Sequence, residues 1–139
     1  MNKMFIKNCS KANNLEPGYY KGEVINYEFI RKEELCNGKA FIKSNMTVKI
    51  EGRLLKEQSV SVILENMNLV SKYEELMNKE VVFELDYDYE YEDGTKLKVE
   101  RIYDISEGER LIKEQDEYRT YESVGLDDCT ISLILNYIN

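Results

Sequence analysis

The stretch VVFELDYDYEYEDGTKLKVERIYDI, residues 81–105, alternates apolar and acidic side chains. Because successive side chains of an extended chain point to opposite faces, this alternation predicts a strand with one buried and one wet face. The acidic face would consist of Glu84, Asp86, Asp88, Glu90 and Glu92. The apolar face would consist of Val81, Phe83, Leu85, Tyr87, Tyr89 and Tyr91. The dipeptide Asp93-Gly94 then predicts a turn into a second strand, so the stretch reads as a β-hairpin. That second strand would carry Leu97, Val99, Tyr103 and Ile105 on its apolar face.

The length of this turn decides which residues face each other across the hairpin. A two-residue loop would place acids opposite apolar side chains, which a buried face does not allow. A three-residue loop over residues 92–94, with Gly94 in the left-handed conformation, keeps polar and apolar faces apart. The pairs expected from it are Glu90 with Lys96, Asp88 with Lys98, Asp86 with Glu100 and Glu84 with Ile102. Lysines would then neutralise part of the acidic face and leave Glu84 and Asp86 without a basic residue opposite.

Three more strands and a helix precede the hairpin. Residues 19–30, YYKGEVINYEFI, are rich in aromatic and β-branched residues and predict the first strand. Residues 40–50, AFIKSNMTVKI, predict the second strand, and residues 59–65, SVSVILE, predict the third. Residues 66–80 change to an apolar spacing of three and four, which predicts a short helix. The buried face of the second strand would carry Ala40, Ile42, Met46, Val48 and Ile50.

This order of elements resembles the OB-fold, a five-stranded Greek-key barrel with a helix between its third and fourth strands. The likeness covers residues 16–105 and lies in the layout of strands and helix. An SH3-like barrel, which lacks that helix, and an α+β roll are the competing folds. We predict a mainly β protein with an N-terminal arm over residues 1–15, an OB-like barrel over residues 16–105 and a C-terminal helical extension over residues 106–139.

The C-terminal extension ends in an apolar stripe. Residues 107–125 are charged and predict a solvated helix followed by a linker, and two aspartates then precede a second helical pattern. This stripe at i, i+3, i+4 and i+7 consists of Ile131, Ile134, Leu135 and Ile138. Ile131, Leu133 and Leu135 also alternate as a strand would. Either the barrel of the same chain or a partner, such as a second copy in a homodimer, would cover the stripe.

The composition argues against several classes of function. The chain has no histidine, and its three cysteines lack metal-binding spacing. It has no Gly-rich phosphate loop, and no nucleophile is placed beside a base. A calcium loop around Gly94 would put tyrosines at carboxylate positions. We therefore predict a protein that is not an enzyme and has no cofactor and no metal. The short apolar run near the start is far below a signal peptide or membrane span, so we expect a soluble, cytoplasmic protein.

Charge is divided unevenly along the chain. The net charge is −8, with +5 in residues 1–56 and −13 in residues 57–139. In the positive half, the residues opposite the buried face of the second strand are Phe41, Lys43, Asn45, Thr47 and Lys49. Basic residues interleaved with an aromatic side chain are typical of single-strand binding, although the same pattern also fits the solvated side of an ordinary strand.

The resemblance to the OB-fold implies a ligand across the second and third strands. We therefore predict binding of single-stranded DNA or RNA, in an accessory factor of a phage, plasmid or other mobile element. The candidate nucleic-acid-binding residues are Phe41, Lys43, Lys49, Arg53, Arg31 and Tyr27. The acidic loop over residues 90–93 argues against this function, because it would repel phosphate.

The alternative is an acidic protein-interaction module. Glu84, Asp86, Asp88, Glu90 and Glu92 would occupy a basic groove of a nucleic-acid-handling protein, as inhibitors that mimic DNA do. A basic protein would then be the partner in place of a nucleic acid.

Overall fold

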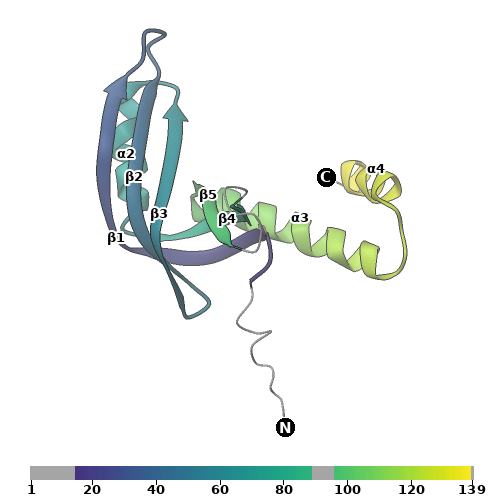
Figure 1. Cartoon of the computed structure of the whole chain (residues 1–139). Coiled ribbons are helices and arrows are strands. Elements are labelled where there is room, and N and C mark those ends of the chain that lie inside the picture. Colours follow the sequence, from purple (N-terminus) through teal and green to yellow (C-terminus); the bar gives the residue numbers. More distant parts are fainter. Residues whose placement is uncertain (1–14, 89–95, 139) are drawn as a thin grey trace.

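The computed structural model describes residues 15–88 and 96–138 of the chain (Figure 1). The described strands are β1 (Gly18–Glu34), β2 (Ala40–Ile50), β3 (Arg53–Leu64), β4 (Glu80–Tyr87) and β5 (Leu97–Tyr103). The described helices are the 3-10 helix η1 (Met67–Leu69) and the α-helices α2 (Val70–Leu76), α3 (Ile105–Ser123) and α4 (Asp128–Ile138). Strands thus dominate the described chain, as the alternating sequence predicts.

The five strands form one antiparallel sheet in the order β3-β2-β1-β4-β5. Three strands joined by hairpins, with the fourth lying beside the first, make a Greek key. The sheet curls until β3 and β5 come into contact, and Gln58 bridges them by accepting a hydrogen bond from the Val99 N–H at 2.8 Å. The prediction of a mainly β, nearly closed five-stranded barrel with a helix between β3 and β4 is confirmed. This arrangement is compatible with an OB-like fold.

The core lies inside this barrel and contains the predicted buried face of β2. The members of that face, each at most 2% exposed, are Ala40, Ile42, Met46, Val48 and Ile50. Phe83 and Leu85 of β4 join them, and Tyr73 and Met77 come from α2 and its C-terminal end. Burial raises the pKa of Tyr73 to about 12, so its hydroxyl stays protonated at physiological pH. Asn66 accepts a hydrogen bond from the Asn68 N–H and caps the 3-10 helix η1, which leads directly into α2.

The predicted register of the β4–β5 hairpin is wrong, by two residues from Leu85 to Tyr87 and by one residue at Glu84 and before it. Leu85 faces Val99, Asp86 faces Lys98 and Glu84 faces Arg101. Glu84 and Asp86 therefore do have basic residues opposite, contrary to the prediction. The three-residue loop predicted from Asp93-Gly94 thus led to the wrong cross-strand pairs. Residues 89–95, which include that loop and Tyr89, Glu90, Tyr91 and Glu92, lie outside the described residues.

A bulge at Glu100 also changes which face the end of β5 presents. The register shifts between Leu85 and Glu84, so one extra residue of β5 lies there. Tyr103 therefore points outward, where it packs edge-on against Tyr19 and donates a hydrogen bond to Glu84 at 3.0 Å. Its predicted place in the core is wrong.

Helix α3 packs on the outer side of β1 and β4 and then extends away from the barrel (Figure 1). Gly108 of α3 lies directly against Val82 of β4, since a Cβ at this glycine would come within 2.2 Å of the valine side chain. The side-chain amide of Gln115 accepts a hydrogen bond from the Tyr19 N–H at 2.8 Å and donates one to the Tyr19 carbonyl at 3.3 Å. Through these contacts α3 covers part of the outer side that the sequence predicted to be solvated.

Helix α4 turns back along the far end of α3 (Figure 1). Ile131 is fully buried, and Ile134 and Leu135 are half-buried, so the chain itself covers this side of the stripe. The homodimer through the stripe stays a prediction, and of its four residues Ile131 is buried within the chain itself. The side chain of Ile138 lies outside the described residues. No helix in the described part of the chain has the length and apolarity to cross a membrane.

Candidate nucleic-acid interface

The outward side of β2 carries the residues predicted to bind nucleic acid. We call this the β2 outer face and define it by its alternate residues, Phe41, Lys43, Asn45, Thr47 and Lys49. These five residues alternate with the buried residues of β2, so all five lie on the side of the strand that faces away from the core. Strands β1 and β3 flank this face.

Lys43 lies in a basic and neutral environment on this face. Its cross-strand neighbours are Arg31 of β1 and Ser61 of β3, so no acid stands directly opposite it on either strand. No ion pair with any described residue engages its ammonium group. The positive charge of Lys43 is therefore available to a ligand.

Phe41 is the aromatic residue of the β2 outer face. The guanidinium of Arg31 lies 5.1 Å from the centre of its ring, within cation–π distance. Arg31 also forms an ion pair with Glu33, which faces Phe41 across the β1–β2 pair. Ile63 of β3, 58% exposed, flanks the ring on the opposite side. The ring is thus held in place and retains an apolar surface beside a positive charge.

Lys49 lies at the other end of the face. It is six residues from Lys43, which corresponds to roughly 20 Å along an extended strand. Its cross-strand neighbours are Glu23 of β1 and Leu54 of β3. The side chain is exposed and makes no ion pair with a described residue.

Two predicted residues do not belong to this face. Tyr27 pairs with the buried Met46 and packs against the core, because β1 contains bulges at Ile25 and Ile30 that shift its register against β2. Arg53 was expected in a turn but begins β3 and pairs with the buried residue Ile50. Their predicted positions on the ligand face are wrong.

The bulges also expose two isoleucines that the sequence analysis missed. Ile25 is 48% and Ile30 is 52% exposed, each next to an outward-facing residue of β1. Leu54, also 52% exposed, adds to them from β3. Both bulge positions are β-branched isoleucines, which are typical of regular strands, so the bulge residues themselves give no sign of the two shifts in register.

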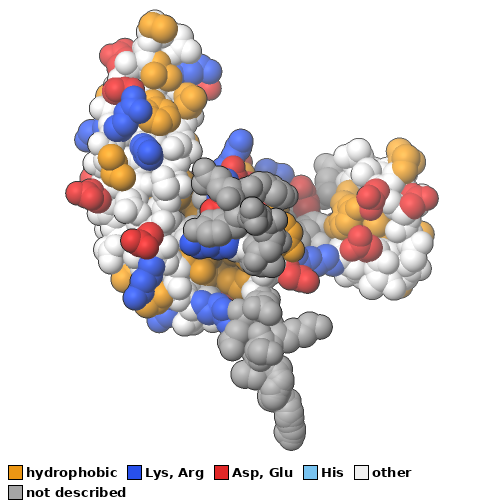
Figure 2. Space-filling model, viewed as in Figure 1, with side chains coloured by type: hydrophobic (Ala, Val, Ile, Leu, Met, Phe, Trp, Pro, Cys, Tyr) orange, Lys and Arg blue, Asp and Glu red, His pale blue; other side chains and the backbone are white. Residues whose placement is uncertain are grey.

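A shallow polar depression of about 190 Å³ opens in the middle of the β2 outer face. Its polar side chains are Asn26, Glu28, Asn45, Thr47 and Glu57, and Tyr27 and Met46 complete its lining. The depression lies between Lys43 and Lys49 along the strand. Figure 2 shows basic and apolar atoms close together over the part of the molecule formed by β1, β2 and β3, with carboxylates among them.

The positive charge of the N-terminal half is less concentrated here than the sequence suggests. Residues 16–56 carry eight Lys or Arg against six acids, whereas Lys3, Lys7 and Lys11 supply the rest of the excess. These three lysines lie outside the described residues. The local arrangement around Lys43 therefore matters more than the charge of the half-chain.

The predicted acidic face is only partly available. Glu84 accepts a hydrogen bond from Tyr103, and Asp86 lies opposite Lys98. The Asp88 N–H donates to the Lys96 carbonyl at 2.6 Å, while Glu90 and Glu92 lie outside the described residues. Cross-strand basic residues thus reduce the negative field of the described acids.

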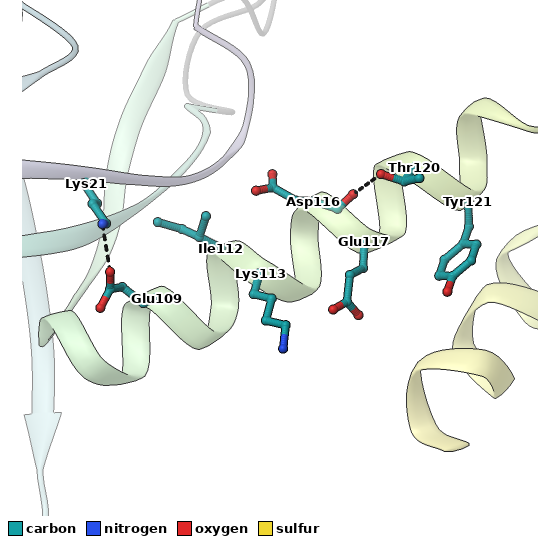
Figure 3. Close-up of a pocket in the computed structure, with 8 residues that line it drawn as sticks. All are labelled: Lys21, Glu109, Ile112, Lys113, Asp116, Glu117, Thr120 and Tyr121. Carbon is teal, nitrogen blue, oxygen red and sulfur yellow. Dashed lines mark hydrogen bonds and ion pairs between the residues drawn. The ribbon is translucent and has the colours of Figure 1, made fainter. Parts of the chain in front are cut away.

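A second groove runs along α3 (Figure 3). At the barrel end of this groove, Lys21 of β1 forms an ion pair with Glu109 at 2.8 Å, which raises the pKa of Lys21. The rest of the groove carries charges of both signs, namely Lys113, Asp116 and Glu117. The mixture gives no consistent attraction for a polyanion.

The described residues contain no group of three or more histidines, cysteines or carboxylates that could hold a metal ion. Cys36 and Cys129 are free and exposed, and Cys9 lies outside the described part of the chain.

No protein-family model matches the chain, and neither a curated protein nor a solved structure gives a significant match to it. The function must therefore be inferred from the β2 outer face itself.

Proposed function

We propose that this chain binds a short stretch of single-stranded DNA or RNA along the β2 outer face. The observation that carries the proposal is the cluster of Arg31, Phe41 and Lys43 on one exposed side of the barrel, with no acid directly opposite Lys43. Single-strand binders combine cations that follow the phosphates with aromatic rings on which bases stack. Compatibility with an OB-like fold supports the same face, because OB proteins bind oligonucleotides there.

The charge distribution limits this binding to a short contact with modest affinity. The protein carries a net charge of −8, so it repels a polyanion at long range. Within a Debye length of about 8 Å, the local cations determine whether a phosphate is attracted. Among the five residues of the β2 outer face only Phe41 has an aromatic ring, so stacking is limited to this position. The protein would act by binding rather than by catalysis, as an accessory factor of a phage or plasmid.

Anisotropy of a labelled single-stranded 20-mer, titrated with protein at low and at physiological salt, tests this proposal. Binding should weaken as salt rises, because each neutralised phosphate releases counterions. Lys43→Glu should weaken binding at low salt at least tenfold, and removal of this contact should lower the salt slope by about 1.

Lys113→Glu on α3 makes the same change of charge at an exposed site away from the β2 outer face and should have a much smaller effect. Equal loss in both variants would mean that only net charge matters. The absence of binding at low salt would contradict the proposed function.

The alternative function, an acidic module that occupies a basic groove of another protein, has less support. Two of its five acids, Glu84 and Asp86, lie opposite basic residues within the hairpin. If oligonucleotides do not bind, a search for a basic partner should compare the wild type with the Asp86→Lys/Asp88→Lys variant.

A further inference from the structure

Two irregularities of the sheet meet at Thr47. On one side, the bulge at Ile25 precedes Asn26, which faces Thr47. On the other side, β3 passes from Leu55, opposite Val48, to Gln58, opposite Met46, so two of its residues have no partner on β2. One of these is Glu57, whose φ of 55° lies in the left-handed region. The bulges separate the flanking strands around Thr47 and produce the polar depression described above.

The side chains of this depression have unused hydrogen-bonding capacity. Two carboxylates, two amides and one hydroxyl line it: Glu28, Glu57, Asn26, Asn45 and Thr47. Within the described part of the chain, no side-chain hydrogen bond or ion pair engages any of the five. The two carboxylates come from the strands on either side of β2: Glu28 lies opposite Asn45, and Glu57 lies in the part of β3 that has no partner beside Thr47.

The depression lies between the two lysines of the β2 outer face. Lys43 and Lys49 stand two residues before Asn45 and two residues after Thr47, on the same side of the strand. A single strand that follows β2 would place phosphates near both lysines, roughly 20 Å apart, and at least one base between them. The groups that face this base are mainly hydrogen-bond acceptors.

Acceptors select among the bases by the donors on their edges. An ionised carboxylate accepts hydrogen bonds through two oxygens and donates none. The Watson–Crick edge of an unpaired base is open to such contacts in a single strand. Guanine presents two adjacent donors, N1–H and N2–H₂, whereas adenine, cytosine and thymine each present a single donor group on that edge. An asparagine amide can donate to guanine O6 at the same time.

We propose that the depression binds a guanine base of the single strand, through Glu28 or Glu57 together with an adjacent asparagine. This inference rests on the proposed function, since the lysines that flank the depression must hold the strand. It adds base preference to a face that otherwise binds through phosphates and stacking.

Three labelled oligomers test the proposal: a thymidine 19-mer, the same oligomer with one central guanine, and the same oligomer with inosine in place of that guanine. Inosine lacks the N2 amino group and removes one of the paired donors. The guanine oligomer should bind about tenfold more tightly than the other two, as expected for a bidentate contact. The titrations use low salt, where phosphate contacts are strongest.

The single variants Glu28→Gln and Glu57→Gln show which of the two carboxylates accepts the hydrogen bonds of guanine. The variant that removes the contact should bind all three oligomers with the affinity of the thymidine oligomer. Glu74→Gln, an exposed substitution on α2, is the matched control and should keep the guanine preference. Unfolding curves of both depression variants check that the barrel is intact.

Each remaining outcome has a definite meaning. Salt-sensitive binding with equal affinity for the three oligomers would overturn the guanine site and leave the proposed function standing. A guanine preference that survives in the double variant Glu28→Gln/Glu57→Gln would also overturn it. Failure of every oligomer to bind at low salt would reject the proposed function itself.

Discussion

At the scale of single residues, the close contact between Gly108 and Val82 determines how near α3 lies to the barrel. Gly108 has no side chain, and this lets the helix approach Val82 closely. Val82 is fully buried although it belongs to the side of β4 that also carries Glu84 and Asp86. The alternation in β4 therefore did not reveal that a helix would cover part of its polar side.

Replacement of Gly108 tests this contact. Gly108→Val should lower the free energy of unfolding by about 1–3 kcal/mol, because the added side chain must displace Val82 or move α3. Urea unfolding measures the change. Valine is a better helix former than glycine, so helix propensity cannot explain a loss of stability, and Asp116→Val, an exposed substitution in the same helix, is the control for introducing a valine. Equal stability of the Gly108→Val variant and the wild type would show that α3 does not pack this closely.

At the scale of elements, aspartates begin both C-terminal helices. Asp104 accepts a hydrogen bond from the Glu107 N–H at 2.9 Å, and Asp127 accepts one from the Thr130 N–H at 2.8 Å. These backbone hydrogen bonds lower the pKa of both carboxyls below the ordinary value of 3.8. The caps explain why the charged α3 and the apolar α4 begin where they do.

The caps predict how stability depends on pH. Their contribution is complete above pH 3.8 and is lost as the pH falls through the lower pKa values of the folded protein. Asp104→Asn should flatten this acid-side loss, because asparagine caps a helix without titrating. Far-UV circular dichroism between pH 5 and pH 2 measures the helical signal. An identical acid profile for wild type and variant would contradict the role of Asp104.

The elements also show how far the sequence could predict the structure. β2 was predicted correctly because its alternation is uninterrupted and its core positions are apolar except for Ser44, whose hydroxyl donates a hydrogen bond to the Val60 carbonyl. β1 and β5 contain bulges at Ile25, Ile30 and Glu100, and each bulge shifts the register of the pairing beyond it. This explains why Lys43 and Phe41 were placed correctly while Tyr27 and Tyr103 were not.

At the scale of the whole molecule, the succession of strands and helix along the chain was predicted from the local patterns, and the Greek-key arrangement was predicted from the resemblance to the OB-fold. The sequence could not show that Gln58 bridges β3 to β5, because that contact joins residues 41 positions apart. Nor could it show the depression, which requires two bulges on different strands to meet beside Thr47. Both features depend on contacts between residues far apart in the sequence, which the local pattern of side chains does not specify.

The overall distribution of charge fits a protein in which one face contacts the ligand. The net charge is −8, and α3 together with the following residues is acidic. The cluster of Arg31, Phe41 and Lys43 lies on the part of the sheet formed by β1, β2 and β3, away from the contact between α3 and β4. A bound strand should therefore affect the β2 outer face and leave α3 unchanged.

Amide chemical shifts of the isotope-labelled protein, titrated with an unlabelled single-stranded oligomer at low salt, show whether the ligand binds along the β2 outer face. We expect the amide signals around Phe41, Lys43 and Lys49 and those of their neighbours in β3 to shift progressively, while the signals of α3 and α4 stay in place. Shifts confined to α3 and α4, or none at saturating oligomer, would contradict it.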